Sequence, residues 1–489
     1  MAGHTNISWL FATRLRLVLL LAVLASTLIY FVWYRDWTVA STLSRTFHGP
    51  IGSKDDEFLT SPTNTQLVPT KANLSAQSSL CHNRYGSGYI TAFSNSAAEY
   101  CDESSNDRLT CFHHRASDDR VDSFCLGGPV TVVSGGAAPK LHLDCALSTH
   151  DADHAKAEVP EVRRFPSYWY NTGPRTIFKE FVDMSHDDER SGSRAADQRD
   201  ISLLIKREDN HANLWHTMME VMSLSMSLDV LRTAIDPSSG EPFLSDEDTQ
   251  DSRIVFLDDL PLGPYHELWQ MMAKLPPVRM ADPEAKIINT SRIVVPLPGG
   301  SNPFWQGDWV DLACGESELL RAFSRRVLKF YDLRSPPKRR TDHLTVTMID
   351  RQQKRRLLDK ETYFEALQAR HPEVRFQLVD FAAKSFREQV EIAYSTDILI
   401  GVHGAGLTHG MFLPSQSALV EILPPKLDHK GFHNMARFLG HRYHGEHATE
   451  QDAPGGNGDW QQDDVFIDQD SFLSLADQAI VDVRKARGI

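Results

Sequence analysis

The sequence is not rich in positive charge, because 51 Lys and Arg residues stand against 65 Asp and Glu residues, for a formal net charge of -14. This balance argues against a protein that binds nucleic acid by neutralising its phosphates. Apolar residues make up 41% of the chain, and glycine and proline are not enriched. The composition therefore excludes a collagenous, a fully disordered or a multi-span membrane protein, but it allows one membrane span and a local basic pocket.

Several motifs of common site types are missing. The chain has no Gly-x-Ser-x-Gly segment of the kind that holds a hydrolase nucleophile. Asp258-Asp259 follows a predicted strand but lacks the Asp-x-Asp spacing of a divalent-metal site. The acid clusters Asp246-Glu247-Asp248 and Asp468-Gln469-Asp470 lie in polar stretches. We therefore expect no metal and no cofactor.

An apolar run lies near the N-terminus. Leu17–Tyr34 contains 18 residues without a charge, which span roughly 27 Å as a helix and so just cross a bilayer. Arg14 and Arg16 precede the run and no acid occurs before Asp36, so the positive-inside bias keeps residues 1–16 in the cytosol as a short tail. The run exceeds the usual signal-peptide core of about 7–15 residues. We expect an uncleaved anchor at 17–34, with a cleaved signal peptide as the alternative.

Both alternatives place the rest of the chain in the lumen of the secretory pathway. Residues 35–80 are rich in Ser, Thr and Pro, which predicts a flexible stem. The sequons at Asn73 and Asn289 would face the lumen and could carry glycans.

The cysteines also fit an oxidising compartment. The chain has six of them, and five lie within residues 81–145. No two are spaced as in a zinc knuckle, so the pattern favours disulfides over a zinc site. The six residues are Cys81, Cys101, Cys111, Cys125, Cys145 and Cys314. Fifteen pairings are possible, and an unpaired Cys314 remains an alternative.

Strands and helices alternate beyond the stem. At roughly 150 residues per domain, 489 residues correspond to about three units, or to two large ones with appendages. The apolar pattern predicts strands at Ile201–Lys206, Arg253–Leu257 and Arg292–Pro296, and helices at Leu214–Arg232 and Ser317–Leu333. Pro336-Pro337 then marks a predicted linker. We expect an N-terminal α/β lobe at 81–335, with a Cys-rich start, and a C-terminal α/β lobe at 336–489.

The alternation is clearer in the second lobe. Its predicted strands are Leu344–Ile349, Val374–Val379, Asp397–Gly401 and Ala418–Leu423, and its predicted helices are Lys360–Arg370, Lys384–Ser395 and Gln469–Arg487. Strands separated by helices indicate right-handed crossovers and a parallel sheet. Ligands of such sheets bind beyond the carboxyl ends of the strands. Two α/β lobes facing a cleft are therefore the expected fold.

A glycine-rich segment follows the predicted strand Asp397–Gly401. Glycines at 401, 404 and 406 leave room for a phosphate to approach the backbone N–H groups. The spacing is neither Gly-x-Gly-x-x-Gly nor a P-loop, so a tight structural turn is an equal alternative. His403 adds a polar group, and Glu421 ends the next strand, where it could bind a hydroxyl or form a salt bridge.

Residues 334–356 are strongly basic. They contain eight Lys and Arg residues and two Asp residues, a local charge of +6. Arg351 directly follows a predicted strand, where its guanidinium group could bind a diphosphate bidentately. Arg355 or Arg356 lies one turn further on. Lys338, Arg339 and Arg340 are more simply a solvated basic face.

A third group of polar residues lies in the first lobe. Glu208 is in the loop after strand Ile201–Lys206, and Asn213, His216 and Glu220 follow. His216 and Glu220 are one helical turn apart on one face, so an imidazole and a carboxylate could deprotonate a hydroxyl. A plain surface pair is the alternative. The four methionines at 218, 219, 222 and 226 are most simply core residues.

These segments resemble glycosyltransferase family 61. The resemblance is most specific in Asp397–Pro424, with Gly-Val-His-Gly-Ala-Gly-Leu-Thr-His and Phe-Leu-Pro, and covers about residues 200 to 424. Leu319–Ser324, Val346–Arg356 and Asn213–His216 with Glu220 also look like stretches of that family. The resemblance implies an inverting, metal-independent transferase with a GT-B-like pair of Rossmann-type domains, which moves a sugar from a UDP-sugar to a protein Ser/Thr or glycan hydroxyl.

The resemblance also implies roles for residues. The donor would be bound by Arg351, Arg355, Arg356, His403, Gly404, Ala405, Gly406 and Glu421, with the arginines at the diphosphate and Glu421 at the nucleoside. Inversion takes one displacement, so a base must activate the acceptor. We expect His216 or Glu220 as that base, Glu208 in reserve, and Asn213 on the acceptor side.

Alternatives remain for the substrate and the compartment. UDP-GlcNAc is the favoured donor, and UDP-xylose transfer to N-glycans is the alternative. A non-catalytic lumenal UDP-binding or scaffold protein, with residues 81–145 as its interaction module, is the other alternative. The chain ends Ala486-Arg487-Gly488-Ile489 without a Lys-Asp-Glu-Leu signal. We therefore expect a single-pass type II protein of the Golgi membrane, with the endoplasmic reticulum as second choice.

Overall fold

The computed structural model describes residues 79–117, 119–133, 139–148, 159–185, 200–208, 211–282, 292–333, 343–449 and 458–489. They belong to one compact unit, Thr65–Ile489. The predicted anchor at 17–34, the stem up to residue 78, both sequons at Asn73 and Asn289, and the linker at Pro336-Pro337 lie outside the described residues. Within the ranges that are described, no helix has the length and apolar content needed to cross a membrane.

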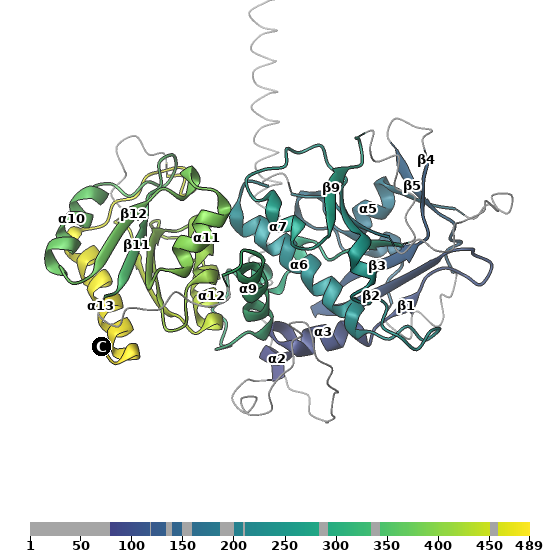
Figure 1. Ribbon diagram of the computed structural model, residues 1–489, viewed down its shortest axis with the longest axis horizontal. Helices are drawn as coiled ribbons and strands as arrows, with labels where there is room; N and C mark the ends of the chain where they lie inside the picture. The colour runs from purple at the N-terminus through teal and green to yellow at the C-terminus, as the bar shows by residue number, and fades with distance from the viewer. Residues whose placement is uncertain are drawn as a thin grey trace, which may run out of the picture. The chain divides into compact units, whose positions relative to one another are not determined.

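Residues 79–333 form a seven-stranded sheet, a three-stranded sheet and the helices packed on them (Figure 1). Their strands are β1 Ala98–Glu99, β2 Arg108–Ser117, β3 Arg120–Gly128, β4 Thr131–Val133, β5 Lys140–Leu143, β6 Val182–Met184, β7 Ile201–Ile205, β8 Ser252–Phe256, β9 Leu275–Arg279 and β10 Arg292–Val295. Their α-helices are α2 Ser79–Tyr85, α3 Ser87–Ser94, α5 Pro174–Glu180, α6 Leu214–Thr233, α7 His266–Gln270, α8 Pro303–Gln306 and α9 Glu318–Phe330. Short 3₁₀ helices are η3 Val162–Arg164, η4 Trp169–Asn171, η5 Asp248–Asp251 and η7 Gly299–Ser301.

The seven-stranded sheet is mixed, in the order β1-β2-β3-β10-β7-β8-β9. Strands β10, β7, β8 and β9 are parallel neighbours, whereas β1, β2 and β3 join them by antiparallel pairing. The predicted strands and helices of this region are present, and the sheet also contains the antiparallel strands β1, β2 and β3. The antiparallel hairpin escaped prediction because its apolar pattern is interrupted by buried polar residues such as His113, which is bonded to Ser123 over 2.9 Å.

Residues 343–489 form a five-stranded, fully parallel sheet in the order β12-β11-β13-β14-β15. The strands are β11 Thr345–Ile349, β12 Arg375–Val379, β13 Ile398–Val402, β14 Ala418–Leu423 and β15 Arg442–His447. The helices are α10 Lys360–Arg370, η8 Phe381–Ala383, α11 Phe386–Tyr394, η9 Ala405–Phe412, α12 Gly431–Leu439 and α13 Gln469–Arg487. Each predicted element of this region is confirmed to within two residues, and α12 and β15 are additional.

The central strands of this sheet are buried on both faces. Every residue of β13 and β14 is buried, as expected for a parallel sheet covered by helices. Alternate side chains point to opposite faces. Ile398 and Ile400 belong to the core formed with α10 and α13, whereas Leu399 belongs to the core formed with α11 and η9. Figure 1 shows α10 and α13 together on one side of this sheet.

Helix α6 is buried nearly all round, which makes it the central helix of residues 79–333. Its four methionines are core residues, as predicted. Asn213 caps the helix, because its side chain accepts a hydrogen bond from the Trp215 backbone N–H over 3.0 Å. The amphipathic α9 is capped in the same way by Ser317.

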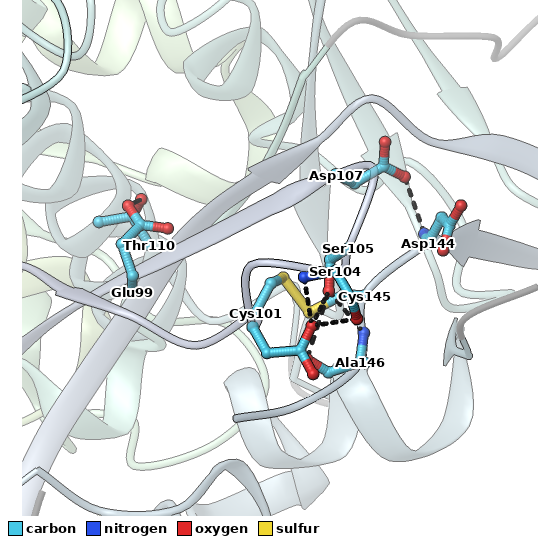
Figure 2. The surroundings of a disulfide bond; sticks show 10 residues. Glu99, Cys101, Ser104, Ser105, Asp107, Thr110, Asp144, Cys145 and Ala146 are labelled. Atoms are coloured by element: carbon cyan, nitrogen blue, oxygen red, sulfur yellow. Dashed lines mark hydrogen bonds between the residues drawn. A yellow bond between two sulfur atoms is a disulfide. The ribbon is translucent and has the colours of Figure 1, made fainter. Parts of the chain in front are cut away.

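All six cysteines form disulfides. The prediction that the cysteines pair as disulfides is therefore confirmed, and the alternative of an unpaired Cys314 is wrong. The pairs are Cys81–Cys314, Cys101–Cys145 and Cys111–Cys125. The last pair joins residues directly opposite each other on β2 and β3. Figure 2 shows the second pair beside Asp107, whose carboxylate accepts from the backbone N–H of Asp144 over 2.8 Å.

We expect the Cys81–Cys314 disulfide to stabilise the chain most. It joins α2 to the loop before α9 across 233 residues, whereas Cys111–Cys125 spans 14. Removal of a disulfide costs about 2–4 kcal/mol, and the loss of chain entropy grows with the loop that the bridge closes. Replacing Cys81 and Cys314 by Ser should therefore lower the thermal midpoint more than the matched double substitution at Cys111 and Cys125. An equal or larger loss for the second variant would contradict this expectation.

Candidate functional site

The glycine-rich turn after β13 lies directly against two arginines. Gly404 has a φ of 144°, which other residues rarely adopt. A Cβ atom at this position would come within 2.7 Å of Nη1 of Arg351 and within 3.0 Å of Nη2 of Arg355. Gly401 and Gly406 instead approach Ile349 of β11. One glycine therefore makes room for the guanidinium groups, and the other two allow the turn to pack on the neighbouring strand.

Arg351 and Arg355 form a partly buried pair of positive charges. Burial lowers the pKa of Arg351 and brings that of Arg355 to about 10, and the charge of Arg351 lowers the pKa of Arg355 further while Asp459 opposes this. Within the described ranges, neither guanidinium group has a carboxylate at ion-pair distance. Nε of Arg351 donates to the carbonyl of Lys354 over 2.9 Å. The Nη atoms of the two guanidinium groups form no hydrogen bond with another of the described residues. Clustered and desolvated cations of this kind suit an anion, which can supply the missing negative charge.

Arg356 is oriented differently. Its guanidinium group donates to the carboxylate of Asp464 over 2.5 Å, and half of its side chain is exposed. The neighbouring Arg355 has a φ of 53°, and this left-handed residue turns the two consecutive side chains apart. Of the two predicted candidates, the structure therefore brings Arg355 to the glycine turn.

A buried hydrogen-bond chain holds His403 at the same turn. Its Nδ1 lies 2.6 Å from Oε1 of Glu421, and the hydroxyl of Tyr443 donates to Oε2 of Glu421 over 2.6 Å. Glu421 is fully buried, with both oxygens engaged. It lies behind His403 and supports it, whereas the sequence suggested contact with a nucleoside. Burial lowers the pKa of His403, although Glu421 opposes this. With Glu421 as acceptor, Nδ1 carries the hydrogen and Nε2 faces the other way.

Aromatic rings surround His403. The ring centroids of His429, Phe432 and Trp460 lie 4.7, 5.4 and 5.8 Å from that of His403. Trp460 also lies beside Arg355, whose Cζ is 5.7 Å from the ring centroid. Sequence reasoning missed these residues, because each comes from a loop or helix far along the chain and none belongs to a local motif.

The predicted polar group at the start of α6 forms a second cluster. Nδ1 of His216 lies 2.8 Å from the carboxylate of Glu208, and the backbone N–H of Glu208 donates to Glu220 over 3.0 Å. Glu208 is therefore the partner of His216, and Glu220 lies behind Glu208. The sequence suggested that His216 pairs with Glu220 along the helix, but in the structure His216 pairs with Glu208. Asn213, expected on the acceptor side, uses its side-chain oxygen to cap the helix.

The protonation of this cluster follows from its burial. Burial and the charge of Glu208 raise the pKa of Glu220 well above its usual value, which favours the neutral form of Glu220. Burial lowers the pKa of His216 to about 4, although the charge of Asp308 opposes this. A neutral His216 that donates from Nδ1 keeps the lone pair on Nε2. This is the arrangement of a general base.

Aromatic residues also flank His216. Its ring centroid lies 4.4 Å from Trp305 and 5.7 Å from Tyr170. Trp169 and Tyr170 are 59% and 40% exposed, and Tyr170 has a φ of 58°. Gly299 lies under the cluster, because a Cβ there would come within 2.9 Å of Oε1 of Glu208. The open side of His216 therefore meets a surface with exposed aromatic side chains.

Asp308 links the two clusters. The backbone N–H of Gly431 donates to Nδ1 of His429 over 3.1 Å, so Nε2 of His429 is the nitrogen that donates to Asp308 over 3.2 Å. The carbonyl of Asp308 also accepts from the backbone N–H of Lys430 over 2.7 Å. Asp308 acts electrostatically on His216 and contacts the ring that packs on His403. Asp308 therefore interacts with one member of each cluster.

The acid clusters considered for a metal have structural partners. Asp258 is bound by the fully buried Arg207 over 2.7 Å, Asp248 by Arg292 over 2.5 Å, and Asp468 caps α13. In the part of the chain that the structure describes, no three His, Cys, Asp or Glu side chains are grouped as metal ligands would be.

The geometry makes a direct prediction for anion binding. Arg351→Ala and Arg355→Ala should each weaken binding of inorganic pyrophosphate at least about tenfold, because a charge-assisted hydrogen bond contributes roughly 1.5–3 kcal/mol. Arg356→Ala is the matched control, since that guanidinium group is bound to Asp464. Isothermal titration calorimetry measures the three affinities. A loss at Arg356 equal to that at Arg355 would contradict the assignment.

Comparisons with known proteins give one family. The model of the family described as Glycosyltransferase 61 matches residues 214–420. A curated relative from Drosophila melanogaster, named EGF domain-specific O-linked N-acetylglucosamine transferase, is 27% identical over 269 residues, which cover 54% of this chain and 46% of the relative. Proteins of the same name from Xenopus laevis and Canis lupus familiaris are 32% and 34% identical, over 27% of this chain and 25% of each relative. The matches thus span less than half of these relatives.

Solved structures add little. The flavodiiron core of Flv1 from Synechocystis sp. aligns with 80% of this chain and 99% of its own at 9% identity and a TM-score of 0.21, a likeness too weak for any argument. The family match includes the start of α6, Arg351, Arg355 and the glycine turn, all of which contribute to the site described above. The resemblance seen in the sequence is therefore confirmed over residues 214–420, which match the glycosyltransferase 61 family.

Proposed function

We propose that this protein is an inverting glycosyltransferase that moves a sugar from a UDP-sugar to a hydroxyl group of a glycoprotein or glycan. The observation that supports this most is the pair Arg351 and Arg355, held against Gly404, together with His216, whose Nδ1 is bound to Glu208. The proposed site would combine a place for a diphosphate with a base for a hydroxyl.

The reaction would proceed as a single displacement. Nε2 of His216 accepts the proton of the acceptor hydroxyl while its oxygen attacks the anomeric carbon of the donor sugar. The bond from that carbon to the diphosphate oxygen breaks, and Arg351 and Arg355 stabilise the negative charge of the departing UDP. Glu208 holds His216 in the required tautomer and stabilises its cation. Because two guanidinium groups can compensate the diphosphate charge, the proposed reaction uses no metal.

The names of the relatives support a choice of donor and acceptor for the proposal. Their name contains N-acetylglucosamine, which favours UDP-GlcNAc over UDP-xylose as the donor here, and it contains the EGF domain, which makes a folded extracellular protein the first acceptor to try. The exposed Trp169 and Tyr170 beside His216 suit a protein surface, since Trp and Tyr are enriched at such contacts.

We further propose a GT-B arrangement, with the acceptor bound by residues of the first lobe and the donor by residues of the second. The proposed compartment is the Golgi lumen, with the predicted anchor at 17–34 in the membrane, and the endoplasmic reticulum as second choice. The disulfides support an oxidising compartment.

The carboxyl pair provides a sharp test of the proposed mechanism. Glu208→Gln should lower the rate of UDP release from UDP-GlcNAc by on the order of 10²–10⁴, because His216 loses the partner that sets its tautomer. Glu220→Gln is the matched control and should leave the rate nearly unchanged, because burial favours the neutral form of Glu220, which Gln resembles in shape and charge. Steady-state kinetics with a folded EGF domain as acceptor measures both rates. Equal losses in the two variants, or no loss in Glu208→Gln, would refute the assigned roles.

A further inference from the structure

Trp460 is a large aromatic residue whose side chain is partly exposed beside Arg355. It lies in the loop between β15 and α13 and is half-buried. Its ring contacts two members of the site, the guanidinium group of Arg355 at 5.7 Å and the ring of His403 at 5.8 Å. It belongs to none of the hydrophobic cores formed by the described residues. Packing of the interior therefore does not explain its position.

The backbone around Trp460 is held in place from both sides. The backbone N–H groups of Gln462 and Asp463 both donate to the carbonyl of Asp459, over 3.0 and 2.9 Å, which forms a tight turn around Trp460. The following residues run beside the arginines, since Arg355 N–H donates to the Gln462 carbonyl over 3.4 Å and Val465 N–H donates to the Arg356 carbonyl over 2.9 Å. Trp460 is thus fixed relative to the residues that would bind the diphosphate.

The neighbours of the ring indicate the kind of ligand. A ligand whose diphosphate lies between Arg351 and Arg355 places its nucleoside within reach of the next open surface of the site. A flat aromatic face beside the guanidinium group of Arg355 suits an aromatic group that is covalently attached to an anion. Stacking on an aromatic side chain is how proteins bind nucleobases without relying on base-specific hydrogen bonds. A sugar-phosphate without a base would make no use of this face.

We propose that Trp460 is the surface on which the nucleobase of the donor stacks. The proposal rests on the proposed function, since it takes the anion between Arg351 and Arg355 to be the diphosphate of a nucleotide sugar. Trp460 would then contribute to binding of the nucleoside, and the arginines to binding of the diphosphate. The competing explanation is that Trp460 only covers Arg355 through a cation–π contact.

Two probes separate these explanations. UDP contains the base and the diphosphate, whereas inorganic pyrophosphate contains the charged groups alone. In the full-length protein, Trp460→Ala should weaken UDP binding by about 10- to 100-fold, the loss expected when one base–aromatic stack is removed. The affinity for pyrophosphate should stay within about twofold of the unmodified protein, because the arginines remain. Calorimetry measures both affinities.

Two further variants sharpen the test. Trp460→Phe keeps a flat ring and should restore most of the UDP affinity. Phe330→Ala removes an exposed ring of α9, which packs on Tyr331, and should change neither affinity. Quenching of Trp fluorescence by UDP but not by pyrophosphate should occur in the unmodified protein and diminish in Trp460→Ala.

Each of the other possible results would contradict one specific part of the proposal. Equal losses for UDP and pyrophosphate in Trp460→Ala would show that the ring only supports Arg355, and unchanged affinities would exclude stacking. If the unmodified protein binds pyrophosphate but not UDP, the nucleotide itself is wrong and Trp460 has no base to bind. If it binds neither, the anion site fails, and with it the proposed function.

Discussion

The site depends on two like charges held close together out of water. Arg351 and Arg355 repel each other and have lost part of their hydration, as their lowered pKa values indicate. In the described part of the chain no carboxylate compensates them at ion-pair distance, and Gly404 provides the space in which they lie. Such an arrangement costs stability unless a ligand supplies negative charge. This pair of arginines is therefore the strongest indication in the structure of a site for an anion.

The parallel sheet explains how this arrangement is maintained. β11 ends just before Arg351, and β13 ends at the glycine turn beside it, so the two segments meet at the carboxyl edge of neighbouring strands. Tyr443 on β15 and Glu421 on β14 extend the support across the sheet to His403. The opposite side of the site rests on α6, whose first turn provides His216. Asp308 binds His429, whose ring packs on His403.

Local sequence patterns predicted the parts of the site that are local. The glycine turn and Arg351 follow strands with clear apolar patterns, and the family resemblance pointed to the same residues. Contacts between residues far apart in the sequence could not be predicted from local patterns. The choice between Arg355 and Arg356 depends on a left-handed residue and on Asp464, and the partner of His216 depends on how the loop at Glu208 folds back. Asp308, Tyr443 and Trp460 have no local signal, and the antiparallel hairpin of β2 and β3 was hidden by its buried polar residues.

The central claim is that one site binds a UDP-sugar by arginine side chains and turns it over without a metal. The most direct measurement is UDP release by the purified protein with a panel of UDP-sugars, including UDP-GlcNAc and UDP-xylose, in the presence and absence of EDTA. The account predicts that one donor, UDP-GlcNAc in the first place, is consumed at a rate that EDTA does not change. Release that EDTA abolishes, or no release and no binding with any donor, would contradict it.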